Sequence, residues 1–365
     1  MGALLLLGVA KGKRVRLQQA ARASLGLPAA QVLDWGDWLA QPQRLPDLLQ
    51  QASPALLKID SPGEDSAVQQ HLLSLGAQLL HKPVPAPVAH GQLMAHDCWF
   101  AGFAECLKQV QAQTAAHPVA LCNAVPDILL MTDKLACQQH LQAQGLPVPP
   151  LLGQIESGDA LLAQMRAQSC SQVFVKIRYG SSACGVLALR SAGGKLAASS
   201  SADWQHSGAG PMLFNSKRIR HYRDARQIMQ IVDWLCAQQA YAEVWLPKPS
   251  APGGHFDLRV LCLQGQARHV VARLSRQAMT NLHLDSQRRS AAEVLAAPHE
   301  QALRCFAGRA AQAFPHSRVI GFDIIQRGVR SCLLEANAFG DLLPGLLHAG
   351  HDPYQDQALH WEAAA

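Results

Sequence analysis

The side chains best suited to bind a metal ion are Asp323, Glu335 and Asn337, which lie within residues 319–343. Residues i and i+2 of a strand share one face, so Glu335 and Asn337 should point the same way. If Asp323 pairs with them across a hairpin, three oxygen ligands converge. Hard oxygen donors of this kind suit Mg²⁺, which takes its other ligands from water and phosphate.

A β-hairpin is the element that must position these three residues. Two short apolar runs, 319–325 and 331–334, flank Gly328, and this pattern predicts two antiparallel strands. The alternative is an edge hairpin whose acids are solvated. We favour the metal site because the carboxylates interrupt apolar runs and because the chain also supplies candidate phosphate-binding residues.

Lys176 is the first candidate phosphate ligand. It lies in the β-rich run 173–177, and a lysine inside a buried strand is costly unless an anion meets it. A segment of small residues follows, ahead of a second predicted strand at 186–189. Its members are Gly180, Ser181, Ser182 and Gly185. Small residues between two strands let backbone N–H groups approach phosphate closely, so the segment predicts a phosphate-binding hairpin.

Two more strand patterns carry polar groups. The strand predicted at 241–247 can pair its backbone with an adenine edge. A further hairpin, predicted at 256–263 and 267–274, carries three charged residues on otherwise apolar strands: Asp257, Arg259 and Arg273. The alternative for Arg259 is an ion pair with Asp257 on a solvated face. Four arginines predict an anionic ligand: Arg218, Arg220, Arg273 and Arg276.

Composition favours an ordinary globular enzyme. The chain has 365 residues, of which 49% are hydrophobic and 16% charged, enough for two or three domains. No apolar run approaches the ~18 residues of a membrane helix, and we expect a cytoplasmic protein with reduced cysteines, since the ten cysteines include no CxxC pair. The net charge of +6 suits nucleotides, and no basic run is interleaved with aromatics as a nucleic-acid surface requires.

The order of predicted elements indicates the architecture. Strands alternate with helices over residues 1–120, which predicts an α/β domain with a parallel sheet. Residues 60–65 (DSPGED) form either a ligand-binding turn at a strand end or a helix N-cap. A single helical stretch is predicted at 127–144, and the Gly/Ser-rich residues 193–210 are predicted as a flexible loop.

The collinear order of short motifs resembles the ATP-grasp superfamily, and most closely its RimK-type carboxylate–amine ligases. The motifs are MTDK at 131–134, VFVKIRYGSSACGV at 173–186, AEVWLP at 242–247, FDLRV at 256–260, TNLH at 280–283, and GFDII with LLEANAFGDLLPG at 321–345. The resemblance implies an α/β (α+β) ATP-grasp fold. Residues 1–120 would form a Rossmann-like pre-ATP-grasp domain, 121–190 an N-terminal subdomain with a phosphate lid, and 191–365 a C-terminal subdomain.

The resemblance also implies a role for each matching residue. Lys134 and Lys176 would hold the ATP phosphates beneath a lid at 180–185. Glu243, Val244 and Leu246 would face adenine, mainly through backbone groups, and Asp257 would lie beside the nucleotide. Arg259, Arg273 and Asn281 would act on the transferring phosphate or the substrate. Asp323, Glu335 and Asn337 would bind Mg²⁺, or Mn²⁺ in its place. We assign Arg218, Arg220, Arg276 and Asp341 to the substrate.

In this family a carboxylate attacks the terminal phosphoryl group of ATP to give an acylphosphate, and an amine then displaces phosphate to form an amide. The implied partners are therefore ATP, an anionic carboxylate substrate, and an amine on an amino acid, peptide or small molecule, without nucleic acid or membrane. Family members often form homo-oligomers. Two alternatives are an ATP-grasp kinase that stops at phosphorylation and a nucleotide-binding scaffold without turnover.

Overall fold

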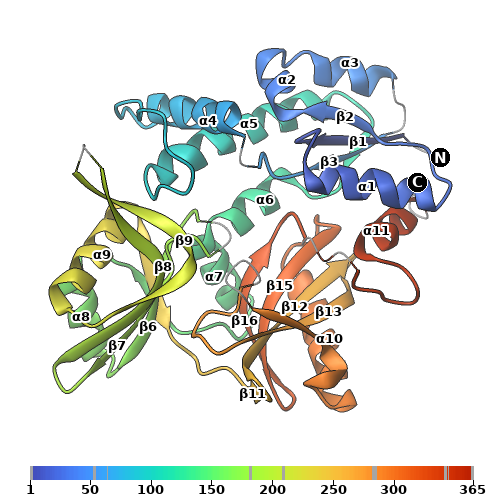
Figure 1. Ribbon diagram of the computed structural model, residues 1–365. Helices are drawn as coiled ribbons and strands as arrows, with labels where there is room; N and C mark the ends of the chain where they lie inside the picture. Colours follow the sequence, from blue (N-terminus) through green and yellow to red (C-terminus); the bar gives the residue numbers. More distant parts are fainter. Residues whose placement is uncertain are drawn as a thin grey trace.

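The computed structural model describes residues 3–51, 55–63, 65–180, 183–207, 210–281, 286–340, 343 and 345–362. It contains three sheets: a parallel N-terminal sheet, and two antiparallel sheets that lie beneath it on either side of two short helices (Figure 1). Among the described residues, no helix is both long and apolar enough to cross a membrane.

The N-terminal sheet has the order β2-β1-β3-β4, and all its pairs are parallel. Its strands are β1 (Ala3–Gly8), β2 (Gln31–Asp34), β3 (Ala55–Ile59) and β4 (Val119–Leu121). Five helices accompany them: α1 (Lys13–Ser24), α2 (Trp35–Ala40), α3 (Arg44–Gln51), α4 (Ser66–Leu79) and α5 (His96–Ala115). The predicted parallel sheet, with helices between its strands, is confirmed.

Both faces of this sheet are buried, which is why β1 is a continuous leucine run. Leu5 and Leu7 belong to the same buried cluster as Phe103 of α5. Leu6 points to the other face, where it shares a cluster with Val15 of α1. Alternate residues of one strand thus serve two cores.

Asp65, the last residue of the predicted turn at 60–65, caps a helix. Asp65 is the N-cap of α4, and its carboxylate accepts hydrogen bonds from the backbone of Ala67 (2.9 Å) and Val68 (3.0 Å). Asp60 is buried and pairs with Lys58. Of the two alternatives for this segment, Asp65 therefore supports the helix N-cap. Glu64 lies outside the described residues.

Two helices, α6 (Val125–Thr132) and α7 (Lys134–Ala143), lead from the first sheet to the second. The prediction of one helix over 127–144 is wrong at Asp133. The side chain of Asp133 accepts a hydrogen bond from the backbone of Ala136 at 3.1 Å and so caps a new helix. The break places Lys134 at the first position of α7.

The second sheet is antiparallel, with the order β5-β10-β6-β7-β8-β9. Its strands are β5 (Leu151–Gln154), β6 (Gln172–Ile177), β7 (Leu187–Ala192), β8 (Lys195–Ser207), β9 (Gly210–Tyr222) and β10 (Ala240–Val244). Helix α9 (Ala225–Ala237) packs against it, and α8 (Gly158–Ala167) packs beside α9 and joins the same buried cluster through Leu161 and Met165. The sheet thus extends past residue 190, where a subdomain boundary was predicted, because β8 to β10 pair with strands on the other side of that point.

The prediction of a flexible loop at 193–210 is wrong. Gly193 and Gly194 form only a two-residue turn between β7 and β8, with positive φ angles of 55° and 74°. Beyond the turn, β8 and β9 pair as a long hairpin, in which Ala202 and Leu213 are fully buried. The serine and alanine residues of this segment suggested a loop by composition. They occupy strand positions here because a helix, residues 225–237, packs against β8 and β9.

The third sheet has the order β14-β13-β12-β15-β16, with β11 (Ser250–Ala251) paired to β12. Its other strands are β12 (Gly254–Leu263), β13 (Gln266–Ser275), β14 (Gln287–Ser290), β15 (Val319–Arg327) and β16 (Arg330–Asn337). Helix α10 (Ala297–Ala311) packs against β12, β13, β15 and β16. Both predicted hairpins, β12–β13 and β15–β16, are confirmed.

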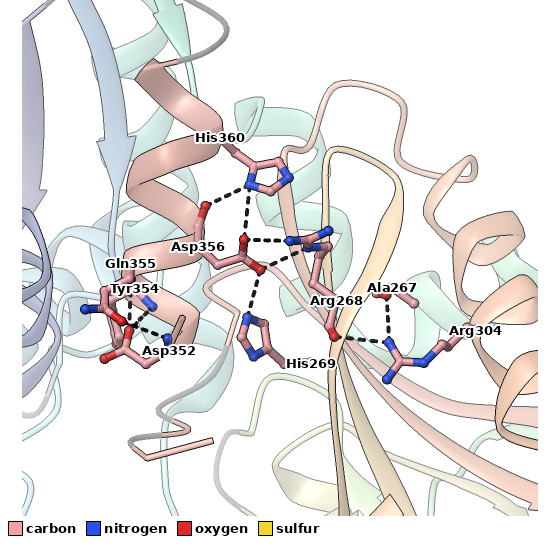
Figure 2. Close-up of polar contacts among 9 residues, drawn as sticks. All are labelled: Ala267, Arg268, His269, Arg304, Asp352, Tyr354, Gln355, Asp356 and His360. Atoms are coloured by element: carbon pink, nitrogen blue, oxygen red, sulfur yellow. Dashed lines mark hydrogen bonds and ion pairs between the residues drawn. The ribbon is translucent and has the colours of Figure 1, made fainter. Parts of the chain in front are cut away.

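The last helix, α11 (Pro353–Glu362), fastens the third sheet to the N-terminal domain. It lies beside α1 (Figure 1). On its other side, the buried carboxylate of Asp356 accepts two hydrogen bonds from Arg268 (both 3.0 Å) and faces His269 Nε2 at 2.9 Å (Figure 2). Buried charges need partners of this kind, so the network fixes where α11 docks.

Candidate functional site

The β15–β16 hairpin brings the three predicted metal ligands together. Asp323 lies directly opposite Glu335, and Gly321 lies opposite Asn337. Glu335 and Asn337 are two residues apart on β16, so they share the face on which Asp323 also points. With its amide oriented to satisfy its neighbours, Asn337 donates to Glu335 Oε1 at 3.2 Å. The predicted pairing of Asp323 with Glu335 across a hairpin is confirmed, and the role of the three residues as metal ligands stays a prediction.

A chain of buried ion pairs surrounds Asp323. Arg259 Nε lies 2.8 Å from one carboxylate oxygen, and Arg273 Nη2 lies 3.0 Å from the other. Arg273 also donates from Nε to Asp257 at 2.8 Å, and Lys248 lies 3.0 Å from the second oxygen of Asp257. The alternative of a solvated pair between Arg259 and Asp257 is therefore wrong: each pairs with another residue in a buried network.

Burial and charge push the carboxyl pKa values apart. Burial raises the pKa of Asp323 above its usual range, although Arg259 and Arg273 oppose the shift. Burial would also raise the pKa of Asp257, but Arg273 and Lys248 outweigh it and bring the value to about 2. In Glu335, Lys134 and Lys176 similarly outweigh burial and lower the pKa. Asp257 and Glu335 are thus held as anions.

The second sheet supplies the opposite wall. Lys176 of β6 lies 2.5 Å from Glu243 Oε1 on the adjacent strand β10. Burial would lower the pKa of Lys176, but Glu243 raises it above its ordinary value, so the lysine is charged. Lys134, at the start of α7, forms an ion pair with Glu335. Two ammonium groups therefore face the carboxylate hairpin across the gap between the sheets.

One cavity joins these walls and collects most of the predicted site. Its lining includes Lys134, Lys176, Gly180, Glu243, Val244, Leu246, Asp257, Arg273, Asn281, Asp323 and Glu335. Apolar side chains occupy the part near the end of β10, among them Phe174, Met279 and Ile325. A cavity with one apolar end and one end rich in cations and carboxylates suits a nucleotide with a metal ion.

The remaining predicted residues lie elsewhere. Arg259 and Asn337 contact two residues that line the cavity, Asp323 and Glu335 respectively. Gly185 has a positive φ of 61°, and an added Cβ there would collide with the side chain of Ile177. Arg276 lines a second cavity. Arg218 and Arg220 are exposed on β9, and Arg220 pairs with Asp203 at 2.7 Å. Ser181, Ser182 and Asp341 lie outside the described residues.

Sequence reasoning missed two groups. Lys248 and Thr280 both bond to Asp257, yet neither lies in a recognisable spacing with it. The root of the predicted lid is also anchored: Arg178 makes two hydrogen bonds to Asp133 (2.7 and 2.6 Å). Beside it, the ring of Tyr179 stacks on Phe100 of α5, with centroids 4.2 Å apart and an interplanar angle of 11°.

The donor set fits a hard divalent cation. Among the described residues, no group of three or more His, Cys, Asp or Glu side chains forms a metal site. A cation on the hairpin would therefore take two carboxylates and one amide oxygen from the protein, which leaves positions for phosphate and water, as Mg²⁺ prefers. Glu243 Oε2 is buried without a hydrogen-bond partner, and Glu243 lines the same cavity.

Comparisons with known proteins give the fold. No protein-family model and no curated protein sequence matches the chain. Among solved structures, the ATP-grasp ligase PsnB complexed with a minimal precursor is similar over 100% of both chains, with a TM-score of 0.58 and 16% identity. The D-cycloserine synthetase DcsG is similar over 100% of this chain and 99% of its own, with a TM-score of 0.56 and 15% identity.

A third similar structure is the macrocyclase MdnC from Microcystis aeruginosa MRC, bound with the precursor peptide MdnA. The similarity covers 100% of both chains, with a TM-score of 0.55 and 12% identity. At these identities the likeness establishes architecture and leaves substrate open. The chain has the ATP-grasp fold, and the predicted fold class is confirmed.

Proposed function

We propose that this protein is an ATP- and Mg²⁺-dependent ligase of the RimK type that joins a carboxylate to an amine through an acylphosphate. The observation that carries the proposal is the register of β15–β16, which sets Asp323 opposite Glu335. Both acids line one cavity with Lys134 and Lys176. A metal-bound triphosphate needs carboxylates to hold the metal ion and cationic side chains to hold the phosphates, so the two kinds of group together suit it and either kind alone would not.

Each wall of the cavity has a part in the proposed reaction. Lys134 and Lys176 hold the phosphates, and the apolar end beside Val244 and Leu246 takes adenine. Asp323, Glu335 and Asn337 hold Mg²⁺, which activates the terminal phosphoryl group when bound. Phosphoryl transfer needs positioning and charge neutralisation rather than a covalent protein intermediate.

The arginines would stabilise charge on the oxygen atoms that react. Arg273 is fixed by Asp257 and Asp323, and burial would lower its pKa, but these two carboxylates raise it above the ordinary value. Its charge is therefore permanent and its orientation set before substrate binds. We place Arg259, Arg273 and Asn281 beside the departing phosphate and the tetrahedral oxyanion.

The acceptor is an amino acid, a peptide or another small molecule. Structures of PsnB and MdnC hold precursor peptides, which supports a peptide, while DcsG is a D-cycloserine synthetase, which supports a small molecule. Arg218, Arg220, Arg276 and Asp341 remain predicted substrate contacts. A cytoplasmic location and homo-oligomeric assembly belong to the same proposal.

Thermal unfolding with a non-hydrolysable ATP analogue, with and without Mg²⁺, tests the nucleotide site. Ligand at ~100 times its Kd should stabilise the protein by about 2.7 kcal/mol. Lys176→Ala should lose the shift, and Glu335→Ala should lose its Mg²⁺ dependence. Lys108→Ala, an exposed lysine on α5, is the matched control and should retain both.

Turnover distinguishes the ligase from its alternatives. A ligase releases ADP and phosphate only when both a carboxylate and an amine are supplied. A product that retains phosphate would identify a kinase. Nucleotide binding without ADP release across carboxylate and amine pairs would favour the scaffold.

A further inference from the structure

A second cavity, of about 460 Å³, opens between the second sheet and the segment that follows β13. Strands β6 to β9 form one wall, while His255 of β12 and residues 276–278 form the other. Its volume lies in the range of small-molecule sites in proteins, roughly 300–1,000 Å³. It shares Lys248 with the cavity proposed for the nucleotide, and no other described residue lines both.

The strand register explains why this wall is hollow. Arg190 of β7 lies opposite Ala197 of β8, and Arg223 follows directly after β9, whose residue Tyr222 pairs with Ala198. Arg190, Ala197 and Arg223 therefore occupy one row across three strands. With strands ~4.8 Å apart, the two arginines start roughly 10 Å from each other, and the small Ala197 between them leaves space.

The next row repeats the pattern. Ala188, Ser199 and His221 lie opposite one another on β7, β8 and β9, and all three line the cavity. Small side chains thus make the floor, and longer cationic or imidazole side chains stand around it. His221 Nδ1 faces Ser199 Oγ at 2.9 Å, so the imidazole is oriented by a neighbour on the floor.

Arg190 is held in place by an aromatic ring. Its guanidinium carbon lies 4.5 Å from the ring centroid of Trp245, a cation–π contact. The backbone of Trp245 donates to Gln172 O at 3.1 Å, which anchors the ring to β6. A guanidinium that is already oriented loses less conformational entropy when it binds a ligand.

The charges around the cavity are of one sign. Arg190, Arg223, Arg276 and Lys248 line it, and within the described part of the chain no carboxylate does. Lys248 forms an ion pair with Asp257. Among the described residues, none of the three arginines forms an ion pair with a carboxylate. Three guanidinium groups around one hollow attract anions, and each can bind a carboxylate or phosphate through two parallel hydrogen bonds.

We propose that this cavity binds a small organic anion that carries at least two carboxylate or phosphate groups. The site is separate from the triphosphate position: Gln172 and Lys176 are four residues apart on β6, roughly 13 Å along the strand. The separation of Arg190 and Arg223 favours a ligand with two anionic groups over a monoanion. The inference concerns binding and does not rest on ligase turnover.

Isothermal titration calorimetry with defined probes tests the site. Citrate, pyrophosphate and acetate are titrated into the full-length protein without Mg²⁺, with a non-hydrolysable ATP analogue saturating the nucleotide cavity. Citrate or pyrophosphate should bind, and acetate should not. The difference in affinity between citrate and pyrophosphate shows whether the cavity prefers carboxylate or phosphate groups. Binding should weaken as salt is added, because exposed charges are screened.

Variants locate the bound anion. Arg190→Gln and Arg223→Gln should each weaken binding at least tenfold, since each removes a charge-assisted contact. Arg190→Lys keeps the charge but loses the planar fork, and should fall between wild type and Arg190→Gln. Arg226→Gln, an exposed arginine of α9 outside the cavity, is the matched control and should bind as wild type does.

Three results would overturn the proposal. One is no binding of either polyanion at millimolar concentrations. Another is equal affinity in wild type and both glutamine variants, with melting temperatures showing that the variants are folded. The third is binding that appears only when the nucleotide analogue is left out of the titration, which would place the anion at Lys134 and Lys176 instead.

Discussion

Asp356 pairs α11 with Arg268 and His269 of the third sheet, and Asp356→Asn is the perturbation that tests what this pairing contributes. The substitution keeps the size of the side chain and removes its charge. The carboxylate is 2% exposed, the imidazole of His269 is 0% exposed, and Arg268 is 24% exposed. His269 cannot turn to water for a replacement partner, whereas Arg268 partly can.

The expected loss follows from these exposures. Breaking one partner of a buried ion pair costs about 3–5 kcal/mol, and the partial exposure of Arg268 places this case near 3 kcal/mol. With an unfolding entropy of about 2.1 cal/mol/K per residue, 3 kcal/mol lowers the Tm of a chain of this length by roughly 4 °C. Differential scanning calorimetry measures this directly.

Asp352→Asn is the matched control on the same helix. Asp352 accepts hydrogen bonds from the backbone of Tyr354 (2.8 Å) and Gln355 (2.9 Å) at the start of α11 (Figure 2). Asparagine caps helices as well as aspartate does, so the Tm should change by less than ~1 °C, the shift expected of a few tenths of a kcal/mol. Equal melting temperatures for the two variants would refute the reasoning.

The pH dependence of this effect has a definite sign. Burial would raise the pKa of Asp356, but Arg268 and His269 outweigh it and hold the pKa below the ordinary value. A carboxylate with a depressed pKa stabilises the fold above its unfolded pKa, and that contribution is lost as pH falls. The difference between wild type and Asp356→Asn should therefore shrink below about pH 4.

Three further predictions concern other parts of the chain. Burial lowers the pKa of His96 to about 4, so the unfolded state binds more protons than the folded state below pH 6.5. The unfolding free energy should therefore fall by about 2 kcal/mol between pH 7 and pH 5. Urea titrations at both pH values should show a smaller fall for His96→Gln than for wild type. Tyr179→Ala should speed hydrogen exchange in residues 178–186 and weaken nucleotide binding, whereas Tyr179→Phe, which keeps the stack on Phe100, should do neither. Asp65→Ala should lower the unfolding free energy by about 1 kcal/mol and Asp65→Asn by far less; similar losses in both would contradict a capping role.

Much of the site follows from local sequence. The alternation of side chains along a strand predicts that Glu335 and Asn337 share a face, and Gly328 between two apolar runs predicts the hairpin that brings Asp323 to them. The same reasoning identifies the strand that bears Lys176. These conclusions need only the two-residue period of a strand and the length of a turn, both of which are readable within about 20 residues.

Prediction from local sequence fails where contacts with distant parts of the chain decide the secondary structure of a segment. Residues 193–210 have the composition of a loop, yet α9 covers β8 and β9 and makes them a hairpin. Asp133 breaks a pattern that is otherwise helical throughout, because its side chain caps α7 and also pairs with Arg178, which directly follows β6. In both cases the decisive neighbour lies outside any local window.

The sequence by itself thus determined the hairpins β12–β13 and β15–β16, the strand that bears Lys176 and the fold class. Only the tertiary structure decided which charges pair: Arg259 with Asp323, Asp257 with Arg273 and Lys248, and Asp356 with Arg268. It alone brought Arg276 beside Arg190 and Arg223 around a second cavity. The reason is that a buried charge takes as its partner whichever opposite charge the docked sheets bring within reach, and that depends on how distant elements pack rather than on spacing along the chain.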